Sequence, residues 1–365
     1  KELLMTKTVL VGLSGGVDSS VCALLLKEKG YRVIGATMAI WGDGKNYPAE
    51  IKKSAKDSCF KPDEKESIEK VKNIADELNI EFHALDCSKE YKNIVLDYFK
   101  DEYLKGRTPN PCVRCNSLIK FRALPLAAKK AGIEFDYFAT GHYARIEKEG
   151  NRFLLKKGIN PKKDQSYFLY NLSQEQLSKI WLPLGTYTKD EIRKIASDYN
   201  LDVATKPDSQ DFYSGDYCEL LNIKEKEGNI VDTKGNILGH HKGIWNYTTG
   251  QRKGLRISSS EPLYVLSLDK DKNEVIVGHK DETFKKVLFA NNINIIATDK
   301  FKNNFQAQAK FRSTQDAKDV TVEKINEDEI KVTFNEYQKS IATGQSVVLY
   351  DDDIVIGGGI IDRVE

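Results

Sequence analysis

Long hydrophobic runs are absent from this sequence of 365 residues. No stretch approaches the roughly 18 consecutive apolar residues that a membrane-spanning helix needs, so we expect no membrane segment. The apolar run within "KELLMTKTVLVGLSGG" is too short for a secretory signal and contains no small-residue cleavage site. We therefore expect a cytoplasmic protein whose thiols are reduced.

The sequence also lacks an excess of charge of either sign. It has 56 Lys and Arg against 54 Asp and Glu, which leaves a net charge of +2. The protein as a whole is therefore not a polycation, and any nucleic-acid surface must be a local basic patch. We find no internal repeat and no low-complexity tract. The length predicts two or three domains, because a single core stops growing near roughly 250–300 residues.

Cysteine is scarce, with six in the chain, and only one C-x-x-C pair is present: Cys112 and Cys115 in "NPCVRCN". A reduced compartment argues against a framework of disulfides. A structural zinc site usually needs four ligands from two such pairs, and no second pair exists. The chemical role of Cys112 and Cys115 must therefore be inferred from other motifs in the chain.

Short apolar segments alternate with segments of helical periodicity over the first part of the chain. This alternation predicts an α/β domain with a doubly wound parallel sheet, which we assign to residues 1–205. The expected strands are 8–13, 32–40, 80–87 and 135–142, and the expected helices are 19–30, 63–79, 91–106 and 121–132.

The composition changes after about residue 205. Residues 206–283 are rich in Gly, Asp, Thr and aromatics, which predicts a small mixed module of short strands and loops. Residues 284–365 contain short alternating segments such as "EIKVTF", in which Ile330, Val332 and Phe334 fall on one face. We expect a C-terminal β-barrel there.

A glycine-rich loop, "GLSGGVDSS" at 12–20, lies between the first expected strand and helix. Two adjacent glycines allow a tight turn whose N–H groups, together with the helix N-terminus, can bind phosphate. Ser14 and Ser19 add hydroxyl groups. Asp18 would repel phosphate unless a cation intervenes, which predicts Mg²⁺ between Asp18 and a pyrophosphate group. The loop is neither a Walker A loop nor a Rossmann fingerprint.

The string "SGGVDS" resembles the pyrophosphate loop of the ATP-pyrophosphatase (PP-loop) superfamily, whose members cleave ATP to AMP and pyrophosphate. Further strings, in this order, resemble the tRNA-specific 2-thiouridylases: "GRTPNPCVRCNSLIKF", "ATGHYAR", "KKDQSYFLY", "TKPDSQDF", "YTTGQRKGL" and "GQSVVLY". The resemblance implies a tRNA-uridine 2-sulfurtransferase. Such an enzyme adenylates the C2 oxygen of the wobble uridine and displaces AMP with sulfur.

The same resemblance implies partners and site residues. The partners are the anticodon stem-loop of tRNAs with a wobble uridine and a sulfur donor, which is a cysteine desulfurase, a sulfur relay protein or sulfide. Cys115, Cys112 and Asp18 would be catalytic. The implied ATP-binding residues are Gly12, Leu13, Ser14, Gly15, Gly16, Val17, Asp18, Ser19, Met38 and Gly141. The implied tRNA-binding residues are Lys163, Asp164, Gln165, Lys310 and Phe311.

The residue types fit these roles on the RNA. Lysines can bind phosphate, and the Gln165 amide can hydrogen-bond the edge of a base. In "QAKFRST", a basic pair flanks Phe311, which suits a contact that combines backbone binding with base stacking. Arg252 and Lys253 of "GQRKGL" add further positive charge.

The chain departs from the family pattern at two positions. Cys112 stands where well-known members have Asp, and Tyr213 stands where they have their second catalytic cysteine. One interpretation is a redox pair in which Cys112 resolves a persulfide on Cys115. Another is a [4Fe–4S] cluster held by Cys112, Cys115 and a third cysteine, with Cys59 as first choice and Cys218 as second. A static zinc site and two plain buried thiols are further alternatives.

Two other classes of function are compatible with a PP-loop. The first is an adenylating ligase or amidase that acts on a small molecule, which would need neither "NPCVRCN" nor a barrel with basic and aromatic residues. The second is a non-catalytic RNA-binding protein that has kept the fold. The intact "SGGVDS" argues against the second class.

Overall fold

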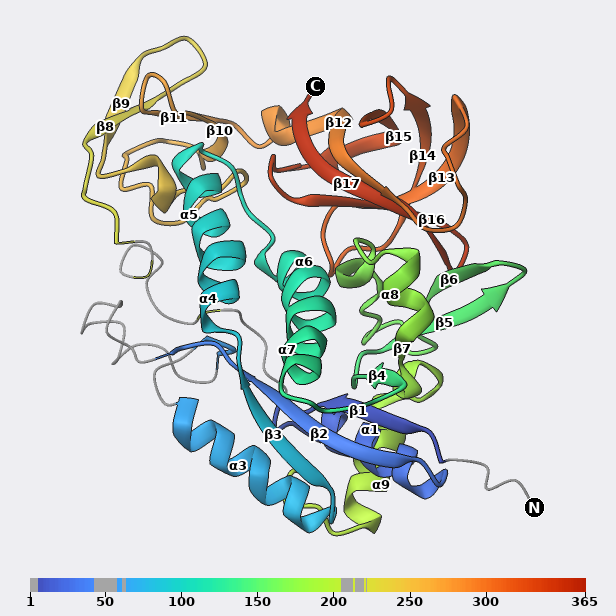
Figure 1. Cartoon of the computed structure of the whole chain (residues 1–365). Helices are drawn as coiled ribbons and strands as arrows, with labels where there is room; N and C mark the ends of the chain where they lie inside the picture. The colour runs from blue at the N-terminus through green and yellow to red at the C-terminus, as the bar shows by residue number, and fades with distance from the viewer. Residues whose placement is uncertain (1–5, 43–57, 61–63, 205–212, 214–219, 221) are drawn as a thin grey trace. The chain divides into compact units, whose positions relative to one another are not determined.

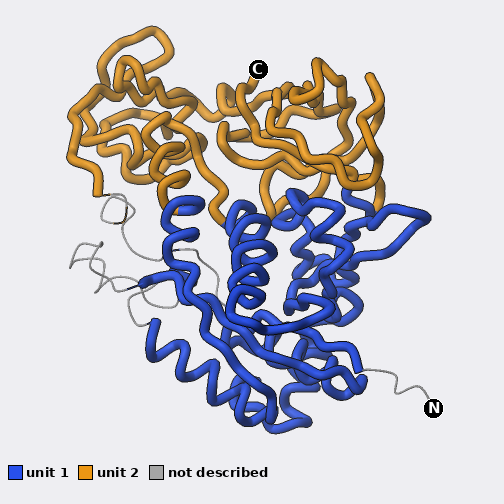
Figure 2. The backbone as a smooth tube through the Cα atoms, viewed as in Figure 1, with its two compact units in different colours: residues 1–95, 112–215, 353–355 blue, residues 96–111, 216–352, 356–365 orange. Residues whose placement is uncertain are grey.

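The computed structural model describes residues 6–42, 58–60, 64–204, 213, 220 and 222–365. The chain divides into two compact units, shown in different colours in Figure 2. Unit 1 contains residues 1–95, 112–215 and 353–355, and unit 2 contains residues 96–111, 216–352 and 356–365. No described helix is long and apolar enough to cross a membrane.

Unit 1 is built on a parallel sheet, as the sequence predicts. Val9, Leu10 and Val11 of the first strand are fully buried, which is typical of a strand covered on both faces. The strands are β1 (Thr8–Gly12), β2 (Arg32–Ala39), β3 (Glu81–Asp86), β4 (Tyr137–Ala139) and β7 (Ile180–Trp181), in the order β3-β2-β1-β4-β7. The order reverses direction between β1 and β4, so the crevice for a ligand is expected at their carboxyl ends.

Helices cover both faces of this sheet (Figure 1). The core that contains Val9 and Val11 also contains buried residues of α1, α3 and α9, whereas α7 packs on β2 and β3. The α-helices of unit 1 are α1 (Val17–Glu28), α3 (Glu64–Glu77), α4 (Ser88–Tyr91), α6 (Pro111–Arg114), α7 (Leu124–Lys130), α8 (Gln174–Lys179) and α9 (Lys189–Asp198). Two π-helices, η1 (Lys92–Leu96) and η2 (Cys115–Ala123), and two 3₁₀ turns, η3 (Ser166–Leu169) and η4 (Pro183–Thr186), join them.

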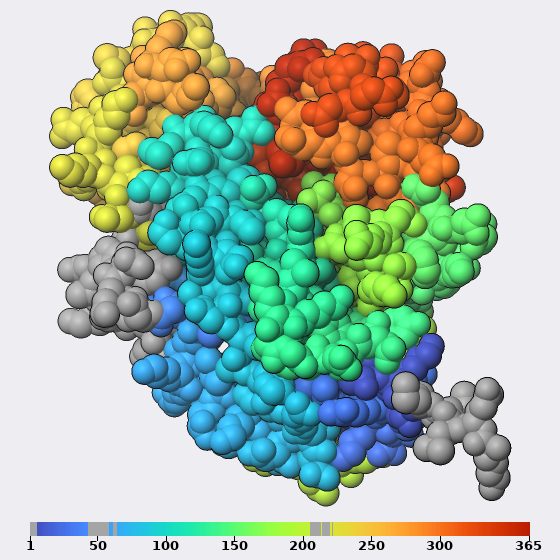
Figure 3. Space-filling model, viewed as in Figure 1, coloured from blue at the N-terminus to red at the C-terminus, as the bar shows by residue number. Residues whose placement is uncertain are grey.

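Local sequence explains where the helices near the site begin. Thr188 accepts a hydrogen bond from the Glu191 N–H, and the Glu191 side chain bonds back to Thr188, so this capping box starts α9 at Lys189. Helix α3 is amphipathic, with only Val71, Ile74 and Ala75 buried, and the other side of the helix contributes to the surface of unit 1 (Figure 3). A hairpin of β5 (Ala144–Glu149) and β6 (Arg152–Lys157) completes the unit.

Unit 2 contains a small mixed sheet. Its strands are β8 (Gly228–Val231), β9 (Ile237–His241), β10 (Tyr264–Asp269) and β11 (Glu274–Gly278), in the order β10-β11-β8-β9. The β11–β8 pair is parallel and the other pairs are antiparallel. Helix α5 (Asp97–Leu104) packs against the 3₁₀ turn η5 (Ile244–Asn246), and a second such turn, η6 (Asp281–Thr283), follows β11.

Six strands form the predicted C-terminal barrel. They are β12 (Phe284–Ile295), β13 (Asn304–Lys310), β14 (Lys318–Lys324), β15 (Glu329–Lys339), β16 (Ser346–Asp351) and β17 (Ile354–Val364). The order β12-β15-β14-β13-β16-β17 is closed by the antiparallel pairing of β12 with β17. Ile330, Val332 and Phe334 are at most 1% exposed in the barrel core, which confirms the alternation read from "EIKVTF".

Candidate active site

The phosphate loop joins β1 to α1 at the centre of the parallel sheet. Gly15 has a φ of +76°, which residues with a side chain rarely adopt, so glycine is required there. The Ser14 N–H donates to Ser19 Oγ over 3.1 Å, and Ser19 Oγ donates to the Gly16 carbonyl oxygen over 3.1 Å. Gly16 is the N-cap of α1, and no side chain caps the helix. The first turn of this 12-residue helix can therefore direct N–H groups at an anion.

Gly141, which follows β4, packs directly against the start of α1. A Cβ at this position would lie 2.7 Å from the Asp18 carbonyl carbon and 2.9 Å from the Ser19 nitrogen, so only glycine fits. Met38 lies near the carboxyl end of β2, on the other side of β1, and is half-buried. The predicted ATP-binding residues thus lie at the carboxyl edge of three neighbouring strands.

Asp18 is held by two residues that the sequence analysis did not identify. Lys189 Nζ donates to both carboxylate oxygens of Asp18, over 2.7 and 2.8 Å, and the Tyr143 hydroxyl donates to Oδ1 over 2.7 Å. Lys189 is only 7% exposed. The carboxylate is therefore paired with a cation of the protein itself. One signal was present in the sequence, because lysine is unfavourable in the first turn of a helix unless it has another role.

The Cys112–Cys115 pair lies at a junction between two kinds of helix. Pro111 occupies the first position of α6, which proline favours, and Cys115 begins the nine-residue π-helix η2. Runs of π-helix are rare in proteins. Those that do occur are often found at functional sites. Side chains anchor this segment from outside: Gln176 Nε2 donates to the Ser117 carbonyl oxygen over 2.8 Å.

Three other cysteines, Cys59, Cys87 and Cys112, lie near Cys115. Cys87 directly follows β3 and precedes α4, which packs against η2. Phe60 stacks on Tyr91 of α4 with ring centroids 5.6 Å apart, which brings its neighbour Cys59 to the same helix. Burial raises the pKa of the Cys115 thiol to about 12, Lys120 opposes this rise, and Cys112, Cys59 and Cys87 add to it. These electrostatic contributions show that the cysteines are close enough to influence one another.

The thiols do not form a ready metal site. Among the described residues, no group of three or more His, Cys, Asp or Glu side chains is arranged to hold a metal ion. Cys59 is exposed, Cys112 is partly buried and Cys87 is buried. Cys218, the second choice for a third ligand, lies outside the described residues. Tyr213, at the position of the family's second cysteine, is only 2% exposed.

The predicted tRNA contacts of unit 1 form an internally bonded turn. Asp164 accepts hydrogen bonds from the N–H groups of Gly158 and Ser166, both over 3.1 Å. Gln165 Oε1 accepts from the Tyr143 N–H over 2.9 Å, and the Gln165 N–H donates to the Tyr143 carbonyl oxygen over 2.9 Å. The Gln165 side chain therefore positions Tyr143, which in turn contacts Asp18. A contact between this turn and RNA stays a prediction.

The predicted contacts of the barrel differ from one another. Lys310 ends β13, with its Nζ 5.8 Å from the centroid of the Tyr350 ring, and stays a predicted contact. Phe311 is 3% exposed and packs edge-on against Phe334 in the barrel core, with ring centroids 5.6 Å apart. The ring therefore offers little exposed surface for a base, the Arg312 guanidinium carbon lies 5.9 Å from its centroid, and a contact of Phe311 with tRNA stays a prediction.

Comparisons with known proteins agree with this arrangement over nearly the whole chain. The model "tRNA methyl transferase HUP domain" matches residues 7–213, "tRNA methyl transferase PRC-barrel domain" matches 220–279, and "Aminomethyltransferase beta-barrel domain" matches 285–361. The curated "tRNA-specific 2-thiouridylase MnmA" of Endomicrobium trichonymphae is 46% identical over 357 residues, which cover 97% of this chain and 98% of the relative. The protein of the same name from Clostridioides difficile (strain 630) is 45% identical, with 99% of each chain covered.

The chain therefore belongs to the tRNA-specific 2-thiouridylase family, within the PP-loop enzymes, as its motifs predict. A third relative of this name, from Acetivibrio thermocellus, is 44% identical over 97% of this chain and 99% of its own length. Enzymes of this family are tRNA-uridine 2-sulfurtransferases.

Proposed function

We propose that this chain replaces the C2 oxygen of the wobble uridine in tRNA with sulfur, and that it consumes ATP to form AMP and pyrophosphate. The observation that carries the proposal is the presence of the phosphate loop and the Cys115 thiols at the carboxyl edge of one parallel sheet in unit 1. The C2 oxygen is a poor leaving group. An enzyme that adenylates it and then delivers sulfur needs both features in one site.

The phosphate loop performs the first half of the reaction. The uridine C2 oxygen attacks the α-phosphorus of ATP, the bond from this phosphorus to the oxygen of the β-phosphate breaks, pyrophosphate leaves, and the uracil N3 proton passes to solvent. The α1 N-terminus and the Gly15–Gly16 turn bind the phosphates. Asp18 and the hydroxyls of Ser14 and Ser19 offer the oxygen ligands that Mg²⁺ prefers, so the residues fit this ion. Bound there, Mg²⁺ would neutralise phosphate charge, and Lys189 would be released from Asp18 to bind phosphate.

Cys115 performs the second half as the sulfur carrier. In the persulfide mechanism, the outer sulfur of Cys115–S–SH bonds to C2 and AMP leaves. Cys112 then attacks the Cys115 sulfur, the S–S bond to the transferred atom breaks, and a Cys112–Cys115 disulfide forms. A thiol reductant must reduce this disulfide before the next turnover. The spacing of the two cysteines by three residues across the α6–η2 junction suits such a pair.

The alternative sulfur carrier is a [4Fe–4S] cluster held by Cys112, Cys115 and Cys59. A cluster with three protein ligands leaves one iron open to carry an extra sulfide. The convergence of four thiols supports this alternative and adds Cys87 as a rival to Cys59. The lack of a preformed metal group among the described residues means that the thiols would have to move to bind iron.

The iron content of the protein distinguishes the persulfide mechanism from the cluster mechanism. The protein is purified and reconstituted without oxygen, and iron and sulfide are counted for wild type, Cys59→Ala and Cys87→Ala. A cluster predicts that one of these variants loses iron and thiolation together while it still adenylates tRNA. If iron-free wild type thiolates tRNA from a persulfide donor, the cluster is excluded. Cys22→Ala is the control, because Cys22 is buried in α1, in the core with β1.

The function itself is tested with unmodified tRNA transcripts. We expect AMP release and 2-thiouridine with a wobble-uridine tRNA, and neither product with a matched transcript that carries cytidine at that position. The sulfur donor in this assay is a cysteine desulfurase, a relay protein or sulfide, and the reduced cytoplasm is the expected location. AMP release without tRNA would instead favour a ligase that acts on a small molecule.

A further inference from the structure

A basic loop in unit 2 is not used by the reaction proposed above. We define the Arg252 loop as residues 251–263, between η5 and β10. Its two ends are tied together, because the Gly250 N–H donates to the Val265 carbonyl oxygen over 2.7 Å and the Val265 N–H donates to the Gln251 carbonyl oxygen over 2.9 Å. Closed ends make this segment an Ω-type loop, a class that is often functional.

Internal contacts give the loop a defined shape. Leu255 is 5% exposed and anchors it to the unit, and Gln251 Nε2 donates to the Lys253 carbonyl oxygen over 2.9 Å. Arg256 has a φ of +53°, a conformation that is uncommon for a residue with a side chain. The loop therefore holds its cationic residues in place rather than leaving them on a random chain.

The charge of the loop is positive and uncompensated. Arg252, Lys253 and Arg256 are exposed, and none of them forms an ion pair with a residue that the structure describes. Glu261 is the acidic residue of the loop, and its carboxylate lies 3.3 Å from His279 Nδ1. The three cationic side chains and the neighbouring serine hydroxyls are thus exposed to solvent, and the carboxylate of the loop, Glu261, is paired with His279.

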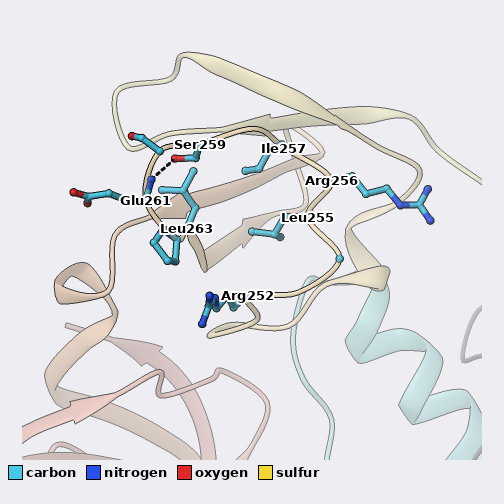
Figure 4. A pocket seen from close by; sticks show the side chains of 10 residues that line it. Arg252, Leu255, Arg256, Ile257, Ser259, Glu261 and Leu263 are labelled. Carbon is cyan, nitrogen blue, oxygen red and sulfur yellow. Dashed lines mark hydrogen bonds between the residues drawn. The ribbon is translucent and has the colours of Figure 1, made fainter.

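A cavity of about 340 Å³ lies within the loop. It is lined by Arg252, Gly254, Leu255, Arg256, Ile257, Ser259, Ser260, Glu261, Pro262 and Leu263. Figure 4 shows the side chains of Leu255, Ile257 and Leu263 on the inner side of the loop, whereas Arg252 and Arg256 extend from it in different directions. Two diverging guanidinium groups suit successive groups of a polyanion better than one small anion.

We propose that the Arg252 loop binds phosphodiester groups of the tRNA backbone. Guanidinium groups bind phosphate through paired N–H donors, and serine hydroxyls add donors. The loop contains no aromatic residue on which a base could stack, so its contact is independent of base sequence. This inference rests on tRNA as the substrate of the proposed function and adds a second, positioning contact in unit 2.

The salt dependence of tRNA binding tests the proposal. The dissociation constant of full-length wild type and of Arg252→Gln/Arg256→Gln is measured between low and physiological salt with one tRNA transcript. Loss of two phosphate contacts should weaken binding about tenfold at low salt and reduce the slope of log Kd against log salt by about 2. Lys270→Gln/Lys272→Gln is the matched control, because it removes the same charge from exposed residues of the same unit.

Three further measurements make the result decisive. Arg252→Lys/Arg256→Lys keeps the charge and should keep the slope near that of wild type, which separates loss of charge from a misfolded loop. An unchanged affinity and slope in the glutamine variant, with wild type binding tRNA normally, would overturn the inference while leaving the proposed function intact. Binding of pyrophosphate alone that is lost in this variant, with tRNA affinity unchanged, would also overturn it. Failure of wild type to bind tRNA would instead contradict the proposed function.

Discussion

The ion pair between Lys189 and Asp18 gives the sharpest test of the active-site geometry. At 2.7 Å, the attraction between the two charges is about 6 kcal/mol in a medium of effective dielectric constant near 20. Removing Lys189 from water offsets much of this attraction, because its side chain is only 9% exposed, whereas that of Asp18 is 29% exposed. We therefore expect a net coupling free energy of about 1–3 kcal/mol.

A double-mutant cycle measures this coupling. Asp18→Asn, Lys189→Met and the double variant are unfolded in urea and followed by circular dichroism. Asp18→Asn should destabilise the protein by about 2–4 kcal/mol, because it leaves a buried ammonium group without its counter-charge. The double variant should be less destabilised than the sum of the two single variants. Effects that add to within about 0.5 kcal/mol would refute the ion pair as described.

The enzymatic activity of the Lys189 variant should also change, and it is measured in a separate assay of AMP formation. Lys189→Met should lower the rate of AMP formation about 100-fold or more, because the proposed function assigns Lys189 the role of a preorganised cation for developing phosphate charge. The control is Lys194→Met on the same helix. Lys194 pairs with Asp198 at 2.6 Å, but its side chain is 74% exposed. Its loss should change neither activity nor, beyond about 0.5 kcal/mol, stability.

Two further predictions concern buried residues. Burial holds the pKa of His142 well below its ordinary value, so below about pH 6.5 the unfolded chain binds a proton that the folded chain does not. The free energy of unfolding should therefore fall by up to about 1.4 kcal/mol per pH unit as the pH drops below that value, and His142→Asn should remove this component from urea titrations at pH 5–7.5. Phe311→Ala should lower the free energy of unfolding of the barrel by about 3–5 kcal/mol, and Phe311→Leu should lower it by much less. At a temperature where both variants are folded, their affinity for tRNA should equal that of wild type. Weaker tRNA binding by folded Phe311→Leu would contradict a purely structural role.

Local patterns in the sequence predicted the features that depend on neighbouring residues. The glycine turn between strand and helix follows from "SGGVDS", and the barrel core follows from alternation in "EIKVTF". Phe311 shows what such a pattern leaves open. It looks like an exposed ring between two basic residues, yet it lies two positions after Ala309, which is fully buried. Strand β13 ends at Lys310, so the alternation of the strand alone does not decide which way the Phe311 side chain points.

Contacts between distant residues could not be predicted in this way. Lys189 is 171 positions from Asp18, and Tyr143 is 125 positions away. Nothing in the local pattern of "YTKDE" states which carboxylate its lysine meets, because that depends on how α9 packs against α1. The role of Gln165 was hidden for the same reason, since its partner is the backbone of Tyr143, a group that any residue type would supply.

The surroundings of Cys115 limit how sulfur can be handled in this chain. Burial raises the pKa of the Cys115 thiol to about 12, so the thiol is protonated near neutral pH and its reactivity as a thiolate is low. Positive charge near the sulfur favours ionisation, and the structure places Lys120 where it lowers the pKa of Cys115. Under the proposed function, either sulfur carrier requires that Cys115 is activated by a neighbouring group, and the iron content of the protein distinguishes the two carriers.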